Sequence, residues 1–236
     1  MLSFPVCPSF QMMGGADEVI LQWDHECIEK ALPVLEEPFR GEGVQDRVPR
    51  LKEIHGHAEL CWRKYAEELG DRCVKYLLIA EAPPWSPCGK QIQYVLDPLS
   101  RSRTLMSALR RDFPAASGLP ADKALAEFAR QGFLILDSMP FSMEYTSNKR
   151  KSDKYRLLIG VTVNAVQEAL RSSSLKWSRD VRIAFSVKLN ARAVIRALEG
   201  RLDLNGTVFS LSETQIAVSE AGYPDAAKLR ALFEEP

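Results

Sequence analysis

The stretch Lys75-Tyr-Leu-Leu-Ile-Ala-Glu-Ala-Pro-Pro-Trp85 is a short apolar run that reaches a carboxylate and then two prolines. Because proline fixes φ and lacks an amide donor, a β-strand has to end here. Such a run is typical of a strand buried on both faces of a parallel sheet, and ligands of open α/β sheets bind beyond the carboxyl ends of these strands. We therefore expect Glu81 at the mouth of a cleft. A carboxylate that only caps or solvates a loop is the alternative.

Beyond this stretch, apolar runs alternate with helical patterns. The predicted strands cover residues 76–80, 133–137, 181–187 and 215–219. The predicted helices cover residues 104–112, 121–131, 155–171, 190–198 and 225–233. This alternation is typical of right-handed βαβ crossovers. It predicts an α/β protein, a three-layer α/β/α sandwich around a four-stranded parallel sheet.

The region before the sheet has a different character. We interpret residues 1–70 as an N-terminal arm and helical extension packed on the core, and residues 71–236 as the α/β domain. A short helical candidate lies at residues 18–31. In residues 49–69, apolar side chains recur at three- and four-residue steps, which predicts an amphipathic helix that stops at Gly70.

The composition indicates a globular chain that can bury a core, with 236 residues, 46% hydrophobic and 26% charged content. No apolar stretch approaches the roughly 20 residues that span a bilayer, and the N-terminus does not resemble a signal peptide, so no membrane contact and a cytoplasmic location are expected. The five cysteines are widely spaced, without a Cys-x-x-Cys pair. Reduced thiols are therefore expected rather than a disulfide framework or a zinc ribbon.

The formal net charge is zero, but it is unevenly divided. Residues 1–100 carry 10 basic and 16 acidic groups, and the remainder carries 21 and 15. Any nucleic-acid surface is therefore expected in the C-terminal part, where Lys149, Arg150, Lys151 and Lys154 could contact phosphates. A solvated loop is the alternative for this basic segment. A strong nonspecific DNA binder is disfavoured, because that affinity comes from phosphate neutralisation.

Polar groups follow three of the predicted strands. Glu81 follows the first, Asp137 and Ser138 follow the second, and Ser219-Glu-Ala-Gly-Tyr-Pro-Asp225 follows the last. The carboxyl ends of parallel strands lie at one edge of a sheet, so these segments are expected to converge. That convergence predicts a site.

These motifs resemble those of the uracil-DNA glycosylase superfamily. Ala80-Glu-Ala-Pro-Pro84 is similar to the Gly-Glu-Ala-Pro-Gly motif of its iron-sulfur branch, and Asp137 stands where the superfamily has a base-reading Asn. Ser186-Val-Lys-Leu-Asn-Ala-Arg-Ala193 is similar to the small-residue turn after the third strand. Tyr223-Pro-Asp-Ala-Ala227 resembles the final His-Pro-Ser-Pro motif. The resemblance covers about residues 75 to 233 and implies the sheet order 2-1-3-4.

The resemblance also implies a function, namely binding of a nucleobase, nucleotide or flipped nucleotide and metal-independent hydrolysis of an N-glycosidic bond in DNA repair. Such an enzyme stacks the flipped base and stabilises a cation-like sugar. Glu81 and Tyr223 would be catalytic. The base-binding residues would be Asp137, Ser138, Tyr94, Ala82 and Pro83, with Tyr94 as the stacking ring or, alternatively, a core residue.

The chain also departs from the superfamily. An ionised Asp137 can only accept hydrogen bonds and would repel the O4 atom of uracil, so uracil specificity is not expected. Tyr223 can donate a hydrogen bond as His does, although its pKa near 10 makes it a different acid. The four-cysteine pattern of the iron-sulfur branch is absent, so no cluster or other cofactor is expected.

Other interpretations remain open. His57 and Cys61 have the i,i+4 step that a metal uses, but a half-exposed helix face is the preferred interpretation and no metal is predicted. The same holds for Asp24-His-Glu-Cys27. A catalytically degenerate binding or interaction protein is the main alternative to an enzyme. Another class of nucleotide-binding α/β enzyme is disfavoured, because a Gly-rich phosphate loop is missing.

Overall fold

The computed structural model describes residues 44–100, 105–140, 147–172, 175–218 and 224–233, and within these ranges the side chains of residues 44–47, 114, 147, 169 and 172 are not described. The predicted helix at residues 18–31 and the predicted catalytic residue Tyr223 lie outside the described residues. Among the described helices, none combines the length and apolarity that crossing a bilayer requires.

A parallel sheet forms the centre of the molecule. It contains β1 (Cys73–Ala80), β2 (Phe133–Asp137) and β3 (Lys176–Phe185), in the order β2-β1-β3. In this register Ala80 lies beside Asp137, and Ile79 lies beside Phe185. β1 is therefore the central strand, with Glu81 directly after its carboxyl end.

The predicted fourth strand is only partly represented in the described residues, where this sheet has three strands. Residue Ile216 makes one isolated parallel bridge to Phe185, next to β3. The 3-10 turn η2 (Glu213–Gln215) precedes it, and a capping box between Ser212 and Gln215 closes this turn. The capping box includes Gln215 in the turn, so the chain reaches β3 only at Ile216. The last residue of the predicted strand, at position 219, lies outside the described residues.

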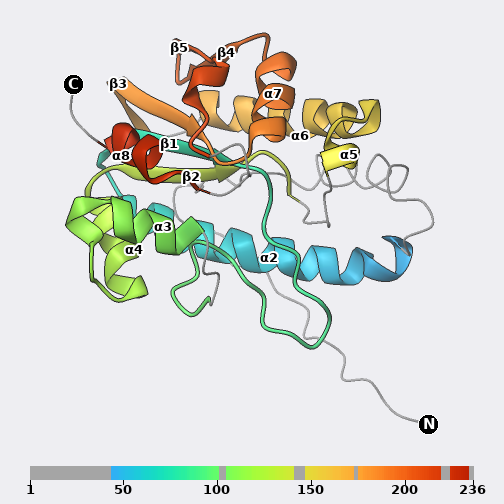
Figure 1. Ribbon diagram of the computed structural model, residues 1–236, viewed down its shortest axis with the longest axis horizontal. Helices are drawn as coiled ribbons and strands as arrows, with labels where there is room; N and C mark the ends of the chain where they lie inside the picture. The colour runs from blue at the N-terminus through green and yellow to red at the C-terminus, as the bar shows by residue number, and fades with distance from the viewer. Residues whose placement is uncertain (1–43, 101–104, 141–146, 173–174, 219–223, 234–236) are drawn as a thin grey trace.

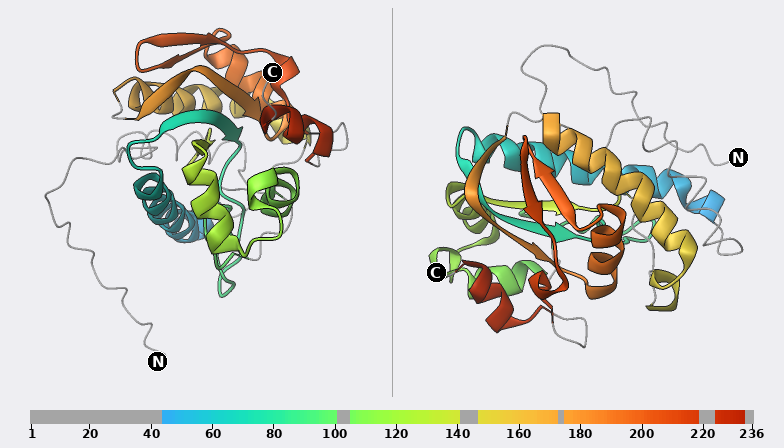
Figure 2. Two further views of the ribbon diagram at one scale, coloured as in Figure 1. Left: turned by 90° about the vertical axis from the view of Figure 1, so that its left-hand side faces the viewer. Right: turned by 90° about the horizontal axis from the view of Figure 1, so that it is seen from above.

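Helices cover both faces of the sheet, which gives three layers (Figures 1 and 2). On one face lie α2 (Val44–Leu69), α3 (Leu105–Asp112) and α4 (Ala121–Arg130). On the other lie α6 (Asp153–Ser172) and α7 (Lys188–Ala197). The short helices are η1 (Pro114–Ala116), α5 (Ser147–Arg150) and α8 (Ala226–Phe233). The predicted helices that lie in the described residues end within two residues of the observed ends, but α2 begins at Val44, five residues before the predicted start at Pro49.

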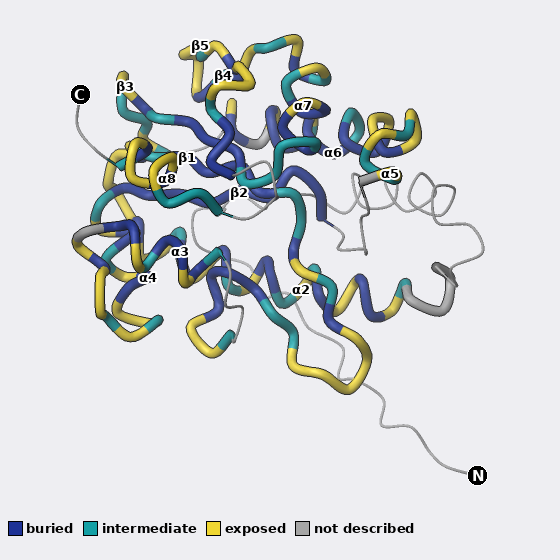
Figure 3. The backbone as a smooth tube through the Cα atoms, in the orientation of Figure 1, coloured by how far each residue is buried: buried dark blue, intermediate teal, exposed yellow. Residues whose placement is uncertain are grey.

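β2 and the carboxyl-terminal half of β1 are buried as the apolar runs predict, whereas β3 extends five residues before its predicted start at residue 181 and none of those five is buried. Every residue of β2 is buried, and so are the last four residues of β1. Figure 3 shows the buried residues concentrated on the sheet and on the inner sides of the helices. An aromatic cluster then attaches α8, since the ring centroid of Phe233 lies 4.5 Å from that of Phe113 and 5.4 Å from that of Phe133.

A β-hairpin that the sequence analysis missed follows α7. It consists of β4 (Arg201–Leu204) and β5 (Thr207–Ser210), joined by Asn205 and Gly206, which both have positive φ. An Asn-Gly pair between short strands is a strong hairpin signal, because both residues tolerate the left-handed region. The Gln167 side chain bonds the backbone N–H and C=O of Asp203 and holds the hairpin on α6.

Candidate functional site

The carboxyl ends of β1, β2 and β3 lie at one edge of the sheet, which brings Glu81 beside Ser138. Of the third segment that was expected here, residues 219–223 lie outside the described residues. The amide of Ser138 donates to the carbonyl oxygen of Ala80 at 2.9 Å, and the amide of Ser186 donates to that of Ile79 at 3.0 Å. The Ser138 hydroxyl also donates to the carbonyl oxygen of Glu81 at 3.0 Å. The backbone therefore fixes where the chain leaves β1 and β2.

Two side chains hold the Glu81 carboxylate, one from α5 and one from α6. The Arg150 guanidinium donates to both carboxylate oxygens, from Nε at 2.7 Å and from Nη2 at 2.6 Å, and the Tyr155 hydroxyl donates to Oε1 at 2.6 Å. The Glu81 side chain is 11% exposed and that of Arg150 is 21% exposed. Hydrogen bonding to Glu81 raises the pKa of Arg150 above its usual range. Glu81 is thus a paired carboxylate.

Asn190 of α7 completes this strand-end network, which consists of Glu81, Ser138, Arg150, Tyr155 and Asn190. The Asn190 amide nitrogen donates to the Ser138 hydroxyl at 2.8 Å and to the Tyr155 hydroxyl at 3.2 Å. Both hydroxyls already donate their hydrogen to Glu81, so they can only accept from Asn190. This fixes the amide orientation. The Asn190 Oδ1 atom is buried and has no hydrogen-bond partner among the described residues.

Asp137 lies beside this network but faces the core. It is 2% exposed, and the hydroxyl of the fully buried Tyr94 donates to its Oδ2 atom at 2.9 Å. Burial raises the pKa of Asp137 to about 7, the negative Glu81 adds to the effect, and the Tyr94 hydrogen bond opposes it. Tyr94 has no exposed face for a base, so this structure corrects its predicted stacking role and supports the alternative of a core residue.

The other predicted site residues differ in how far they are exposed to solvent. Ser138 is 1% exposed, Pro83 is buried and Ala82 is half-buried. Among the predicted phosphate-binding residues, Lys149 is half-buried and Lys151 and Lys154 are exposed. Arg150 is engaged by Glu81 instead. The sequence does not predict a role for Asn190, and its signal there is a polar residue at an inward helix position.

A second cluster, His57, Cys61 and Asp97, lies on the opposite face of the sheet. His57 and Cys61 are one turn apart on α2, and Asp97 belongs to the loop that follows β1. The His57 Nε2 atom is 3.0 Å from Asp97 Oδ2 and 3.6 Å from Cys61 Sγ. One ligand atom from each of the three residues lies within 4.8 Å of the others. The sequence does not indicate that Asp97 lies beside His57, because the two residues are 40 positions apart and only the loop brings them together.

The loop that carries Asp97 is fixed to α2. The buried Arg50 guanidinium donates to the carbonyl oxygens of Ser86 at 2.8 Å and Lys90 at 2.6 Å. At the other end of the loop, the Leu99 amide donates to Asp97 Oδ1 at 2.8 Å. This leaves Oδ2 facing His57. The cluster is thus built from a rigid helix and an anchored loop.

This cluster does not suit nucleophilic catalysis by cysteine. In that chemistry a base removes the thiol proton with one nitrogen while a third group orients the other nitrogen. Here Cys61 and Asp97 approach the same nitrogen of His57. Burial and the nearby Asp97 carboxylate also raise the pKa of the Cys61 thiol to about 11. Without a metal ion, Cys61 is therefore protonated at neutral pH, and a metal that bound its sulfur would release this proton.

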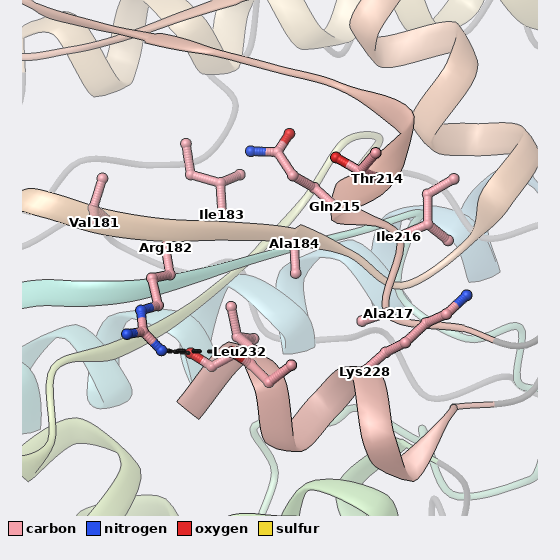
Figure 4. A pocket seen from close by; sticks show the side chains of 11 residues that line it. Val181, Arg182, Ile183, Ala184, Thr214, Gln215, Ile216, Ala217, Lys228 and Leu232 are labelled. Atoms are coloured by element: carbon pink, nitrogen blue, oxygen red, sulfur yellow. Dashed lines mark hydrogen bonds between the residues drawn. The ribbon is translucent and has the colours of Figure 1, made fainter. Parts of the chain in front are cut away.

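Two pockets are present in the described part of the chain. One of about 660 Å³ lies between α2, α4 and residues 90–99, and the three cluster residues line it. The other, of about 360 Å³, lies between β3, η2 and α8 (Figure 4). In the second pocket Arg182 donates to the carbonyl oxygen of Leu232, and the described lining holds no His, Cys, Asp or Glu. Neither described lining includes Glu81 or Asp137.

Comparison with models of protein families, with curated proteins and with solved structures finds no match for this chain.

Proposed function

We propose that this chain has a uracil-DNA glycosylase-like fold and binds a nucleobase or nucleotide at the strand-end network without hydrolysing an N-glycosidic bond. The observation that carries this proposal is the buried Asn190 Oδ1 atom, an acceptor that no described group satisfies. Burying such an atom costs about 1–3 kcal/mol. A ligand N–H group that donates to it would recover this cost, and nucleobases carry such groups beside acceptors.

The finer fold assignment supports this ligand class. β1 is central in the sheet, as the superfamily order 2-1-3-4 requires. The bridge between Phe185 and Ile216 runs parallel, which is the direction expected of a fourth strand beside β3. In such a sheet, ligands bind outside the carboxyl ends of the strands, where Glu81 and Asn190 lie.

Arg150 favours a ligand that carries a phosphate. Its guanidinium is the most exposed charged group of the network and holds a carboxylate in a bidentate geometry that a phosphate can also adopt. A nucleotide phosphate could accept from the N–H groups of Arg150 that do not contact Glu81, while Nε and Nη2 keep their bonds to the carboxylate. The pairing of Glu81 would then persist on binding.

The pairing of Glu81 argues against hydrolysis. Stabilising a cation-like sugar requires a carboxylate whose charge faces the substrate. The charge of Glu81 is already compensated by Arg150 at 2.6 Å. A second candidate function, N-glycosidic bond hydrolysis, is favoured by one observation, the place of Glu81 directly after β1 in a motif that resembles the superfamily's.

Binding is tested by calorimetry with uracil, hypoxanthine, the corresponding nucleoside monophosphates and inorganic phosphate. Asn190→Ala should weaken binding of the preferred base at least tenfold, which is about 1.4 kcal/mol. The matched control is Asn164→Ala, on the exposed side of α6. If the nucleoside monophosphates do not bind, or bind both variants equally, the proposal is wrong.

Hydrolysis is tested by incubating the protein with oligonucleotides that contain uracil, hypoxanthine or xanthine and by measuring abasic sites. We expect none above background. Abasic sites that form with the native chain and disappear in Glu81→Gln would establish the second candidate instead, because that variant keeps the size of the side chain and removes its charge.

A further inference from the structure

We propose that His57, Cys61 and Asp97 bind a zinc ion whose fourth coordination position opens into the 660 Å³ pocket beside α2. The site is separate from the strand-end network and does not depend on its ligand.

Two of the three separations between donor atoms are close to those of a tetrahedral site, and the third, between Cys61 Sγ and Asp97, is within 4.8 Å. With Zn–N and Zn–S bonds of about 2.0 and 2.3 Å, tetrahedral geometry separates the nitrogen and sulfur atoms by about 3.5 Å. The His57 Nε2 and Cys61 Sγ atoms are 3.6 Å apart. The corresponding N to O separation is about 3.4 Å, and the observed distance from Nε2 to Asp97 Oδ2 is 3.0 Å. A shift of the carboxylate by about 0.4 Å therefore makes room for the ion.

Hydrogen bonding alone accounts poorly for this arrangement. A ring nitrogen carries either one hydrogen or one lone pair, in a single direction in the ring plane. The Nε2 atom of His57 nevertheless faces both an acceptor, Asp97 Oδ2, and the Cys61 thiol. An ion on the lone pair of Nε2 would satisfy all three atoms at once.

The carboxylate is held in place as metal ligands usually are. The second oxygen of Asp97 accepts from the Leu99 amide at 2.8 Å, and a hydrogen bond of this kind orients a ligating carboxylate. Asp97 is also almost buried, with 8% of its side chain exposed, and its ion-pair partner among the described residues is His57. Arg50 fixes the start of the same loop on α2.

The donor set indicates which metal fits. A thiolate and an imidazole suit zinc, whereas calcium and magnesium prefer sites built only from oxygen. Three protein ligands leave one position for water or another ligand, as in the zinc sites that act as Lewis acids. The charged groups in the pocket lining balance, so they do not repel a cation; they are Arg50, Lys64, Lys90, Glu53, Glu68 and Asp122.

The test uses the full chain after removal of metals with a chelator. Zinc is titrated against a chromophoric chelator, and cobalt is added separately to record absorption. We expect one zinc ion per chain, with a dissociation constant below about 1 μM. We also expect intense cobalt bands that report a thiolate ligand in tetrahedral geometry.

The variants separate this site from other thiols and imidazoles. His57→Asn, Cys61→Ser and Asp97→Asn should each weaken zinc binding at least tenfold, the scale for losing a ligand or its support. Cys88→Ser, which changes an exposed thiol outside the pocket lining, should not. His25→Asn with Cys27→Ser controls for the other His/Cys pair. Circular dichroism of the metal-free variants confirms folding.

Two results would overturn the proposal. The first is a zinc dissociation constant above about 1 μM in the native chain. The second is affinity that survives His57→Asn and Cys61→Ser but disappears in one of the control variants. Loss of the cobalt charge-transfer band in Cys61→Ser alone supports the assignment of the sulfur ligand.

Discussion

The strand-end network and the His57–Cys61–Asp97 cluster both consist of buried and half-buried polar residues, but they differ in how their charges are compensated. In the network, Arg150 and Tyr155 supply donors to both oxygens of the Glu81 carboxylate. In the cluster, a carboxylate and a thiol face one histidine nitrogen. Among the described residues, the network is therefore complete except for one amide oxygen. In the cluster, the zinc ion proposed above would compensate the Asp97 carboxylate and a Cys61 thiolate together.

The difference predicts how each region responds to change. A satisfied buried network stabilises the fold, and removing one partner leaves the other uncompensated. A set of metal ligands contributes little to stability until the metal binds, and then it couples binding to folding. Substitutions should thus affect stability at the strand ends without any ligand, and at the cluster only with zinc.

The largest expected effect concerns Asp137, which adjoins the network. The carboxyl ionises near pH 4 in the unfolded chain and near pH 7 in the fold. Between these values the folded state binds the extra proton, so this group makes stability fall as pH rises, by on the order of 4 kcal/mol in total. Asp137→Asn removes this dependence, and it should be more stable than the native chain above pH 7 but not below pH 4.

Urea unfolding from pH 4 to pH 8 measures this difference. His55 opposes the trend, because burial lowers its pKa to about 4, so its contribution to stability rises with pH between about 4 and 6.5. Comparing the native chain with Asp137→Asn at each pH removes the contribution of His55 to the difference in stability, because both proteins contain it. Parallel stability curves for the two would show that Asp137 is ionised in the fold throughout.

The next largest effect is expected from a substitution that breaks the ion pair between Arg150 and Glu81. Arg150→Met should lower the free energy of unfolding by about 3 kcal/mol, because it leaves the Glu81 carboxylate uncompensated. Adding Glu81→Gln should restore part of that loss. Arg171→Met is the matched control, since Arg171 pairs with Glu168 and Asp203 while half-exposed, and it should cost about 1 kcal/mol or less. Equal losses in both single variants would remove the contrast.

A smaller effect is expected at the cluster. His57→Asn should change the free energy of unfolding by less than about 1 kcal/mol in the presence of a chelator, because the His57 side chain is 33% exposed. Zinc should raise the unfolding midpoint of the native chain and leave that of the variant unchanged. A large loss without zinc would mean that the cluster is a structural ion pair, like the network.

The smallest effect on the fold is expected from the exposed lysines near the network. Lys151→Ala and Lys154→Ala should leave thermal stability unchanged, since both side chains are exposed. If these residues contact phosphates, each substitution should reduce the slope of log affinity against log salt by about 1 for an oligonucleotide. An unchanged slope would exclude Lys151 and Lys154 from any nucleic-acid surface and leave Lys149 and Arg150 as the anion-binding candidates of this segment.

The sequence predicted most of the fold, because the relevant signals are local. Apolar runs marked β1 and β2, and helical periodicity marked α4 and α6 to within two residues at each end. Two errors had local causes as well. Asn205-Gly206 is a hairpin signal that was overlooked. At the predicted fourth strand, the capping box between Ser212 and Gln215 takes the first residue into a turn.

The sequence by itself determined where the strands end and which carboxylates lie there, since proline and apolar runs act over a few residues. Only the tertiary structure decided what those groups contact. Arg150 reaches Glu81 and Asp97 reaches His57 across many intervening residues. Such contacts depend on how crossover helices and anchored loops pack on the sheet, and no local pattern encodes that packing. The physical reason is that side-chain pairing at these distances follows from burial and geometry in three dimensions.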